Sequence, residues 1–219
     1  MAKQWVRQHQ VQRDEVQDFL DNGVEWVLRN RQTAAAVAGS VAAVILIASV
    51  VVYRTRASRN ETWERLGMAE SLAYSGRGDA AMDQLKQLSS EQPASDAAAY
   101  GAVFTGDLQF QKGQYKEAGD NYLKVVERAT PKPLHPVALT DLAFAQEAAG
   151  QPKEAAQTAQ RFLETYPDHF LAPQAHALLA RALLATGQNE PAKAALQKIV
   201  LQYPDTTWAA WAQSRLKGS

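Results

Sequence analysis

The chain has 219 residues, which is enough for one sizeable domain and an appendage but not for several large domains. Its 23 basic and 23 acidic residues balance, and this argues against a nucleic-acid binder, which would usually carry a basic face. No cysteine is present, so disulfides, thiolate metal sites, cysteine nucleophiles and lipid-modified cysteines are excluded.

Residues 1–32 predict a tail that ends in an amphipathic helix. Apolar residues between positions 11 and 31 recur at spacings of three, four and seven, which places them on one helical face. That face holds Val16, Phe19, Leu20, Val24, Val27 and Leu28, and the other holds Asp14, Asp18, Asp21 and Glu25. Such a helix can lie in a membrane interface, dock on a partner or stay solvated, and its acidic face weakens attraction to anionic lipid.

Residues 33–53 predict a helix that crosses a lipid bilayer. The run TAAAVAGSVAAVILIASVVVY has 21 residues and no charge. At about 1.5 Å per residue it spans roughly 30 Å, the thickness of the hydrocarbon core. Before Tyr53 its polar side chains are those of Thr33, Ser40 and Ser49, whose hydroxyls a helix can bond to its own carbonyls. The flanking arginines are Arg29, Arg31, Arg54, Arg56 and Arg59.

Two other interpretations of this run are weaker. A signal peptide would need a 32-residue leading region that holds five acids, and buried core helices are seldom apolar on every face. The orientation stays open, because within about 20 residues three basic residues precede the run and four follow it. No Gly or Pro interrupts residues 41–66, so we expect residues 54–61 to form a helical stalk that continues into the next domain.

Residues 62–219 contain an internal repeat with a period of 37 residues. Four columns of similar residues keep phase over four units, which is the signature of a stacked repeat array. A proline also recurs near the end of each unit, although the second unit places it one residue late. The columns are Gly76, Gly113, Gly150 and Gly187; Ala81, Ala118, Ala155 and Ala192; Ala69, Gly106, Ala143 and Ala180; and Leu88, Val125, Phe162 and Ile199, with prolines at Pro93, Pro131, Pro167 and Pro204.

Each column has a mechanical explanation in a helix hairpin. The small residue lets two helices cross closely, and the glycine seven residues later ends the first helix with a positive φ. The alanine lies where the second helix presses on the first, the bulky residue fills the space to the next unit, and the proline stops the second helix. We therefore expect an all-α chain with about four stacked hairpins. Residues after Pro204, with Trp208 and Trp211, are expected to form a capping helix.

The columns resemble the tetratricopeptide repeat over roughly residues 62–217. The last two units carry the resemblance best, as LAFAQEAAGQPKEAAQTAQRFLETYP and LLARALLATGQNEPAKAALQKIVLQYP. The resemblance implies a right-handed α-solenoid that follows the single transmembrane helix. The usual period of this repeat is 34 residues, and the three extra residues fall between units, which suggests longer first helices.

Catalytic and cofactor chemistry find little support in the residues. The four histidines, His9, His135, His169 and His176, lack the convergent ligands of a zinc site. The glycines occur singly at helix turns, so no phosphate-binding loop is formed, and no nucleophile motif has a suitable context. We expect no catalytic residue, no metal, no cofactor and no small-molecule substrate, and so a protein that is not an enzyme.

Binding to other proteins is the better-supported function. In proteins with this repeat the concave groove is lined mainly by the first helix of each unit. The resemblance places seven residues toward that groove: Glu70, Tyr74, Asp107, Phe110, Phe144, Glu147 and Arg181. Their mixed charge and aromatic rings suit an extended peptide or a partner helix. Packing inside the domain is an equal alternative for Phe110 and Phe144.

The whole architecture resembles the ancillary subunit family of the bacterial Sec translocon. The run D-E-V-Q-D-F-L…W-V-L in the tail, the single anchor and the C-terminal repeats carry this resemblance. It implies a bacterial inner-membrane protein with periplasmic repeats and a cytoplasmic N-terminus, whose partners are translocon subunits, periplasmic chaperones or exported chains. The last units are also similar to periplasmic coordinators of the Tol-Pal and outer-membrane assembly systems. An envelope-assembly or cell-division adaptor is therefore the alternative.

Overall fold

Over residues 20, 22–128 and 132–218, which the computed structural model describes, the chain forms helices and no strand. The predicted all-α class is therefore confirmed. The chain divides into two compact units, residues 1–58 and 59–219, and each is described by itself. In the first unit residues 22–29 are helical and a turn follows at Asn30. Part of the predicted amphipathic face lies outside the described residues: Asp14, Val16, Asp18, Phe19 and Asp21.

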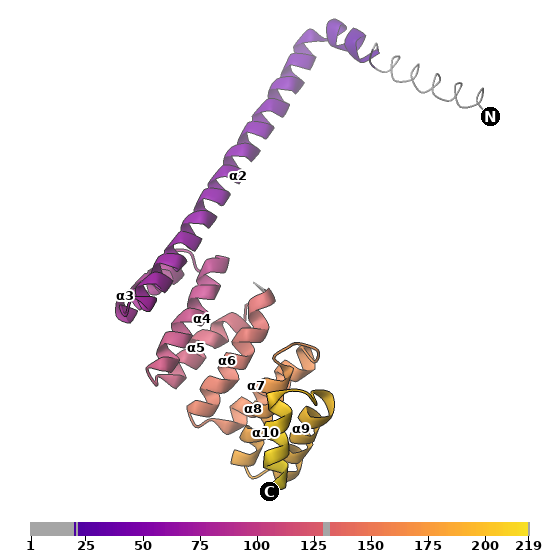
Figure 1. Ribbon diagram of the computed structural model, residues 1–219. Coiled ribbons are helices and arrows are strands. Elements are labelled where there is room, and N and C mark those ends of the chain that lie inside the picture. The colour runs from indigo at the N-terminus through magenta and orange to yellow at the C-terminus, as the bar shows by residue number, and fades with distance from the viewer. Residues whose placement is uncertain (1–19, 21, 129–131, 219) are drawn as a thin grey trace, which may run out of the picture. The chain divides into compact units, whose positions relative to one another are not determined.

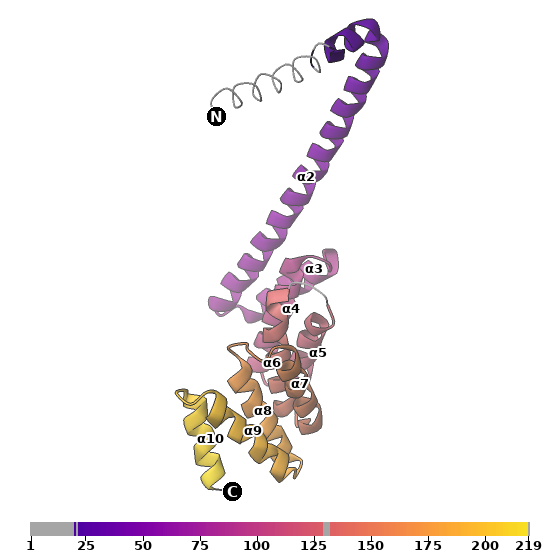
Figure 2. The ribbon, with the colours of Figure 1, turned by 90° about the vertical axis from the view of Figure 1, so that its right-hand side faces the viewer.

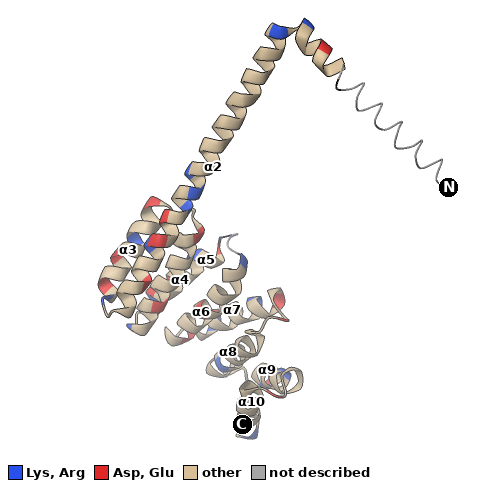
Figure 3. Cartoon of the chain, turned by 45° about the horizontal axis from the view of Figure 1, so that its top comes forward, with Lys and Arg blue, Asp and Glu red and all other residues tan. Residues whose placement is uncertain are grey.

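Helix α2 (Arg31–Tyr74) contains the predicted membrane span. It is the one helix in the described part of the chain that is long and apolar enough to cross a membrane, by length and composition. Figure 3 shows it without charge between its flanking arginines. The hydroxyl of Ser40 donates to the carbonyl of Ala36 at 2.9 Å, and that of Ser49 to the carbonyl of Ile45 at 2.8 Å. The span therefore satisfies these two polar groups internally, as a helix in lipid must.

The second unit is a series of helix hairpins (Figures 1 and 2). We call the first helix of each hairpin its A helix and the second its B helix. The end of α2 is the first A helix, and α10 follows the fourth hairpin. The remaining A helices are α4 (Asp96–Gln111), α6 (His135–Ala148) and α8 (Ala172–Ala185); the B helices are α3 (Gly78–Glu91), α5 (Tyr115–Val126), α7 (Pro152–Thr165) and α9 (Asn189–Gln202); a 3₁₀ turn, η1, spans Lys132–Leu134, and α10 spans Thr207–Lys217.

The repeat columns have the structural roles that the sequence predicts. Each of the four column glycines has a positive φ, between 73° and 79°, and lies in the turn from an A helix to a B helix. The alanine column is fully buried in all four units. The small residue of the A helix and the bulky residue of the B helix are also buried in every unit. The period of 37 residues is therefore a packing period.

The expected lengthening of the A helices is wrong for the last two hairpins. Helices α6 and α8 have 14 residues each, the same as the B helices α7 and α9. The additional residues lie instead in the connection from a B helix to the next A helix, as in residues 166–171. Proline explains this placement: Pro167 ends one helix, and Pro173 is accepted in the first turn of the next, where its missing N–H costs nothing.

The capping helix α10 closes the last hairpin. Thr206 begins it, since its hydroxyl accepts from the backbone N–H of Ala209 at 3.2 Å. Trp208 and Trp211 are partly buried and pack on the apolar cluster that contains Ile199. Their ring centres lie 6.3 Å apart, and the rings meet edge to face. The two indoles thus cover apolar surface that a further repeat would otherwise bury.

A histidine joins two neighbouring hairpins at their connections. His135 Nε2 lies 2.9 Å from the carbonyl oxygen of Val126, and its Nδ1 lies 2.9 Å from the hydroxyl of Tyr166. A carbonyl can only accept, so Nε2 carries the proton and Nδ1 accepts from the tyrosine. The last turn of α5, the start of α6 and the end of α7 are therefore linked by one chain of hydrogen bonds.

Candidate binding surfaces

A row of residues crosses the A helices at the repeat period. Four of the seven predicted groove residues are spaced by 37, so each unit contributes the same position of its A helix. The row reads acid, acid, aromatic ring and cation from α2 to α8. Its members are Glu70, Asp107, Phe144 and Arg181. We refer to it below as the A-helix row.

The C-terminal half of the row forms a contact cluster between α6 and α8 together with Glu147, which lies three residues after Phe144. The guanidinium of Arg181 donates to both carboxylate oxygens of Glu147, at 2.7 and 2.6 Å, and lies 5.6 Å from the ring centre of Phe144. All three side chains are partly buried, so the cluster faces solvent on one side. A bidentate pair of this kind fixes the planes of both groups, so the cluster presents an ordered edge to solvent.

Asp107 lies farther along the row, in a carboxylate cluster. It accepts from the hydroxyl of Tyr122 at 2.7 Å. Burial raises the pKa of Asp107, and the hydrogen bond from Tyr122 opposes this rise. Burial, followed by repulsion from Asp107, raises the pKa of the neighbouring Asp141 to about 7. Asp107 of the row and its neighbour Asp141 therefore carry their charge at a cost near neutral pH.

The other predicted residues separate into packed and exposed side chains. Phe110 is partly buried and packs on the apolar cluster that contains Leu139 and Phe162. Its ring centre lies 5.0 Å from that of Tyr115, edge to face. This is the internal packing that the sequence leaves as an alternative. Glu70 is partly buried, and Tyr74, the last residue of α2, is 86% exposed. The structure thus brings Phe144, Glu147 and Arg181 into direct contact and leaves Tyr74 outside that cluster.

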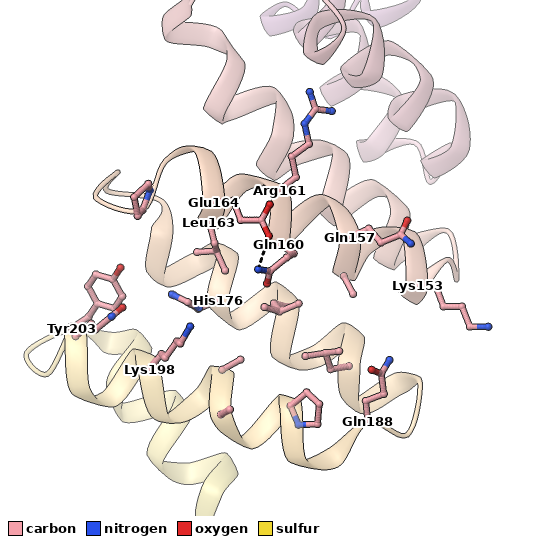
Figure 4. A pocket seen from close by; sticks show the side chains of 18 of the residues that line it. Lys153, Gln157, Gln160, Arg161, Leu163, Glu164, His176, Gln188, Lys198 and Tyr203 are labelled. Atoms are coloured by element: carbon pink, nitrogen blue, oxygen red, sulfur yellow. Dashed lines mark hydrogen bonds between the residues drawn. The ribbon is translucent and has the colours of Figure 1, made fainter.

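The sequence does not predict a second concave surface, which lies between α7, α8 and α9. This pocket has a volume of about 1380 Å³ and is lined by both B helices and by the α8 residues His176, Leu179 and Leu183 (Figure 4). None of the seven predicted groove residues lines it. His176 stands where the two preceding units hold Leu139 and Ala102 and the first unit holds Arg65, so this column does not indicate the pocket. We call this surface the α7–α9 pocket.

A metal site is not formed in the part of the chain that the structure describes, where no three His, Asp or Glu side chains converge. His135 and His169 have hydrogen bonds with protein groups. The A-helix row and the α7–α9 pocket thus remain as the candidate sites.

Comparison with known proteins supports the repeat assignment. Residues 148–216 match the family model described as tetratricopeptide repeat. A structure titled MamA AMB-1 covers 65% of this chain and 73% of its own, at 19% identity and a TM-score of 0.55. A tetratricopeptide repeat protein from Parabacteroides merdae ATCC 43184 covers 70% of this chain and 58% of its own, at 17% identity and a TM-score of 0.61. At these identities the likeness is one of fold. No curated protein matches the sequence.

Proposed function

We propose that this chain, whose residues 148–216 match the tetratricopeptide repeat, is a membrane-anchored scaffold that binds other proteins through its A-helix row. The observation that carries the proposal is the preformed cluster of Phe144, Glu147 and Arg181. A partly exposed ring beside an ordered ion pair offers apolar area and polar edges together, as peptide-binding grooves do. The anchor is the apolar part of α2, residues 33–53.

The row also suggests the chemistry of its ligand. Its first half carries Glu70 and Asp107, with Asp141 beside Asp107, and its second half carries the Phe144 ring and Arg181. A Lys or Arg of a bound segment would relieve the repulsion between the two aspartates. We therefore propose an extended segment or a partner helix with basic and apolar side chains.

The partners we propose are translocon subunits, periplasmic chaperones or exported chains. Support comes from the resemblance of the tail, anchor and repeats to the ancillary Sec translocon subunit family. The repeat domain would then lie in the periplasm of a bacterial inner-membrane protein. An envelope-assembly or cell-division adaptor of the Tol-Pal coordinator type is the second candidate, and its support is the similarity of the last units.

Site-specific photocrosslinking in intact membranes tests the partner class. A benzophenone amino acid at Leu184, which is 39% exposed on α8 next to the row, should capture translocon subunits or periplasmic chaperones. The same group at Lys86, exposed on the B helix α3, is the matched control and should capture less. A partner set without translocon subunits and chaperones contradicts the Sec assignment, and enrichment of division-site proteins favours the adaptor.

Membrane topology can be tested with introduced cysteines, because the natural chain has none. Ser90 and Ser214 are exposed on the repeat domain, so Ser90→Cys and Ser214→Cys provide two reporters that leave the core intact. An impermeant maleimide should label both in spheroplasts. Labelling that appears only after lysis would place the repeats in the cytoplasm and overturn the proposed periplasmic partners.

A further inference from the structure

The α7–α9 pocket is too large for a typical small-molecule site. Its volume of about 1380 Å³ exceeds the roughly 300–1,000 Å³ of most such pockets. It runs along two neighbouring B helices, with α8 as its floor (Figure 4). A surface of this size and shape suits a segment of polypeptide better than a metabolite.

Its floor is apolar. Leu163 of α7 and Leu179 and Leu183 of α8 are partly buried and contribute to the lining, with Ala194 and Ala195 of α9 beside them. Partly exposed leucines in a concave surface release free energy when another apolar side chain covers them, at roughly 25 cal/mol per Å². The floor therefore favours apolar side chains, but it has no side-chain hydrogen-bonding group that would fix the orientation of a bound segment.

His176 supplies a polar group at one end of the pocket. The side chain is 6% exposed, and its Nδ1 is buried without a hydrogen-bond partner in the described structure. The equivalent position one unit earlier is Leu139, which is 1% exposed, so an apolar side chain fits here. A buried nitrogen without a partner costs about 1–3 kcal/mol, so packing alone does not explain a polar ring at this position.

Lys198 lies beside this histidine. In Figure 4 the side chain of Lys198 extends from α9 toward His176. Burial lowers the pKa of His176 to about 4, and the positive charge of Lys198 contributes to this decrease. No ion pair of Lys198 is found among the residues that the structure describes. Of the other charged residues in the lining, Glu164 accepts a hydrogen bond from Gln160 at 3.0 Å. Burial raises the pKa of Tyr203, and the negative charge of Asp168 raises it further. The side chains of Lys153 and Arg161 extend away from the pocket centre.

We propose that the α7–α9 pocket is a second protein-binding site, for a partner segment that combines apolar side chains with one carboxylate. The apolar side chains cover the leucine floor, and the carboxylate lies between the Lys198 ammonium and a ring N–H of His176. A carboxylate matches both groups because it accepts from each, and its charge complements Lys198. This site is separate from the A-helix row, and a scaffold with two such surfaces can hold two partners at once.

Selection from a random twelve-residue phage-displayed peptide library tests the proposal. The full chain in detergent micelles is the bait, and the selected peptides are then made synthetically. Those that bind should carry an Asp or Glu among apolar residues. Replacing that acid by its amide should weaken binding about tenfold, which corresponds to 1.4 kcal/mol.

Variants of the pocket assign the selected peptides to it. His176→Leu and Lys198→Gln should each remove the preference for acid over amide, and His176→Leu should fold because leucine occupies the equivalent position 139. Lys153→Gln is the matched control, since it removes the same charge from a side chain that points away. Its binding should equal that of the natural chain.

Two results would overturn the proposal. One is a selection that yields no peptide whose binding depends on Lys198 or His176. The other is a set of acidic peptides that bind the His176→Leu and Lys198→Gln variants as tightly as the natural chain. Arg181→Gln separates this site from the proposed function. Peptides that lose binding to Arg181→Gln report on the A-helix row, and the pocket proposal is then judged by the His176 and Lys198 variants alone.

Discussion

Gly106 and Tyr122 are matched in size across the second hairpin. A Cβ built on Gly106 would lie 2.5 Å from Cε1 of the Tyr122 ring, closer than real Cβ contacts come. In the first and fourth units the same two positions hold Ala69 with Leu85 and Ala180 with Leu196. The smaller residue on the A helix therefore accompanies the larger residue on the B helix.

Gly106→Ala should lower the stability of the repeat domain. The added methyl group overlaps a ring that is 2% exposed and has little room to move, at a cost of about 1–3 kcal/mol. A gain of up to about 1 kcal/mol in helix propensity offsets part of this. Thermal unfolding followed by circular dichroism should show a lower Tm, and an unchanged Tm would contradict the steric explanation.

Tyr122→Leu in the same chain should recover part of the loss. The double variant then places an alanine on the A helix opposite a leucine on the B helix, which is the combination found in the first and fourth units. Recovery should stay incomplete because Asp107 loses the hydroxyl that donates to it at 2.7 Å. The comparison of both single variants with the double variant measures the coupling between the two positions.

Asp141→Asn should stabilise the domain at neutral pH. The folded pKa of Asp141, about 7, lies above its ordinary value, so the folded state binds more protons than the unfolded state between pH 4 and 7. Stability of the natural chain therefore falls as pH rises through this window, and the variant should not share that loss. We expect a gain of about 1–3 kcal/mol at pH 8 that shrinks toward pH 4.

Chemical denaturation at several pH values measures this effect. Asp83→Asn, an exposed change of the same kind on α3, is the control and should show little pH-dependent gain. Equal gains in both variants would show that net charge, and not burial beside Asp107, is the cause.

Gly150→Ala should destabilise the third hairpin. Its φ of 73° is in the left-handed region, where an L side chain costs about 1–2 kcal/mol. Gly119→Ala is the contrasting change, since Gly119 lies within α5 and a Cβ there would meet its neighbours at 3.7 and 3.8 Å. Thermal unfolding should show a lower Tm for the first variant and an equal or higher Tm for the second.

His176→Leu should raise stability most at acidic pH. The pKa of His176 is about 4 in the folded state and 6.5 in the unfolded state. As pH falls through 6.5, the histidine is therefore protonated in the unfolded state while it stays neutral in the folded state. The natural chain therefore loses stability between pH 6.5 and 4, by up to about 3 kcal/mol, and the variant does not. Glu164 and Asp168, which also line the pocket, are present in both chains, so the difference between the two unfolding curves isolates the histidine. A constant difference across this range would refute the assignment.

The repeat columns could be predicted from the sequence because each is a local steric requirement. A turn glycine such as Gly187 and a contact alanine such as Ala192 are needed wherever the hairpin recurs, so the period reveals them. The sequence places the extra residues between units, but whether they lengthen a helix or the connection could not be predicted in this way. A period gives the length of a unit, and only the positions of Pro167 and Pro173 relative to the helix ends show that the surplus is in the connection.

The contacts of the candidate sites were only partly predictable. The resemblance placed Phe144 and Arg181 on one surface, and their contact follows from the stacking of α6 on α8. The spacing could not show that Phe110 turns inward to Tyr115, because an aromatic residue at the edge of a helical face can pack on either side. The α7–α9 pocket depends on the positions of three helices, and no single residue of the sequence indicates it.

The hydrogen-bond chain through His135 has a consequence for how the domain opens. Solenoids tend to fray one unit at a time from their ends, since each unit contacts only its neighbours. Separating α6–α7 from α5 would leave the Val126 carbonyl without the bond from His135 Nε2, while His135 keeps its bond with Tyr166, so we expect the two hairpins α4–α5 and α6–α7 to unfold together. Deuterium should then enter the amides of α5 and α7 at one common rate, and His135→Ala should split that rate into two.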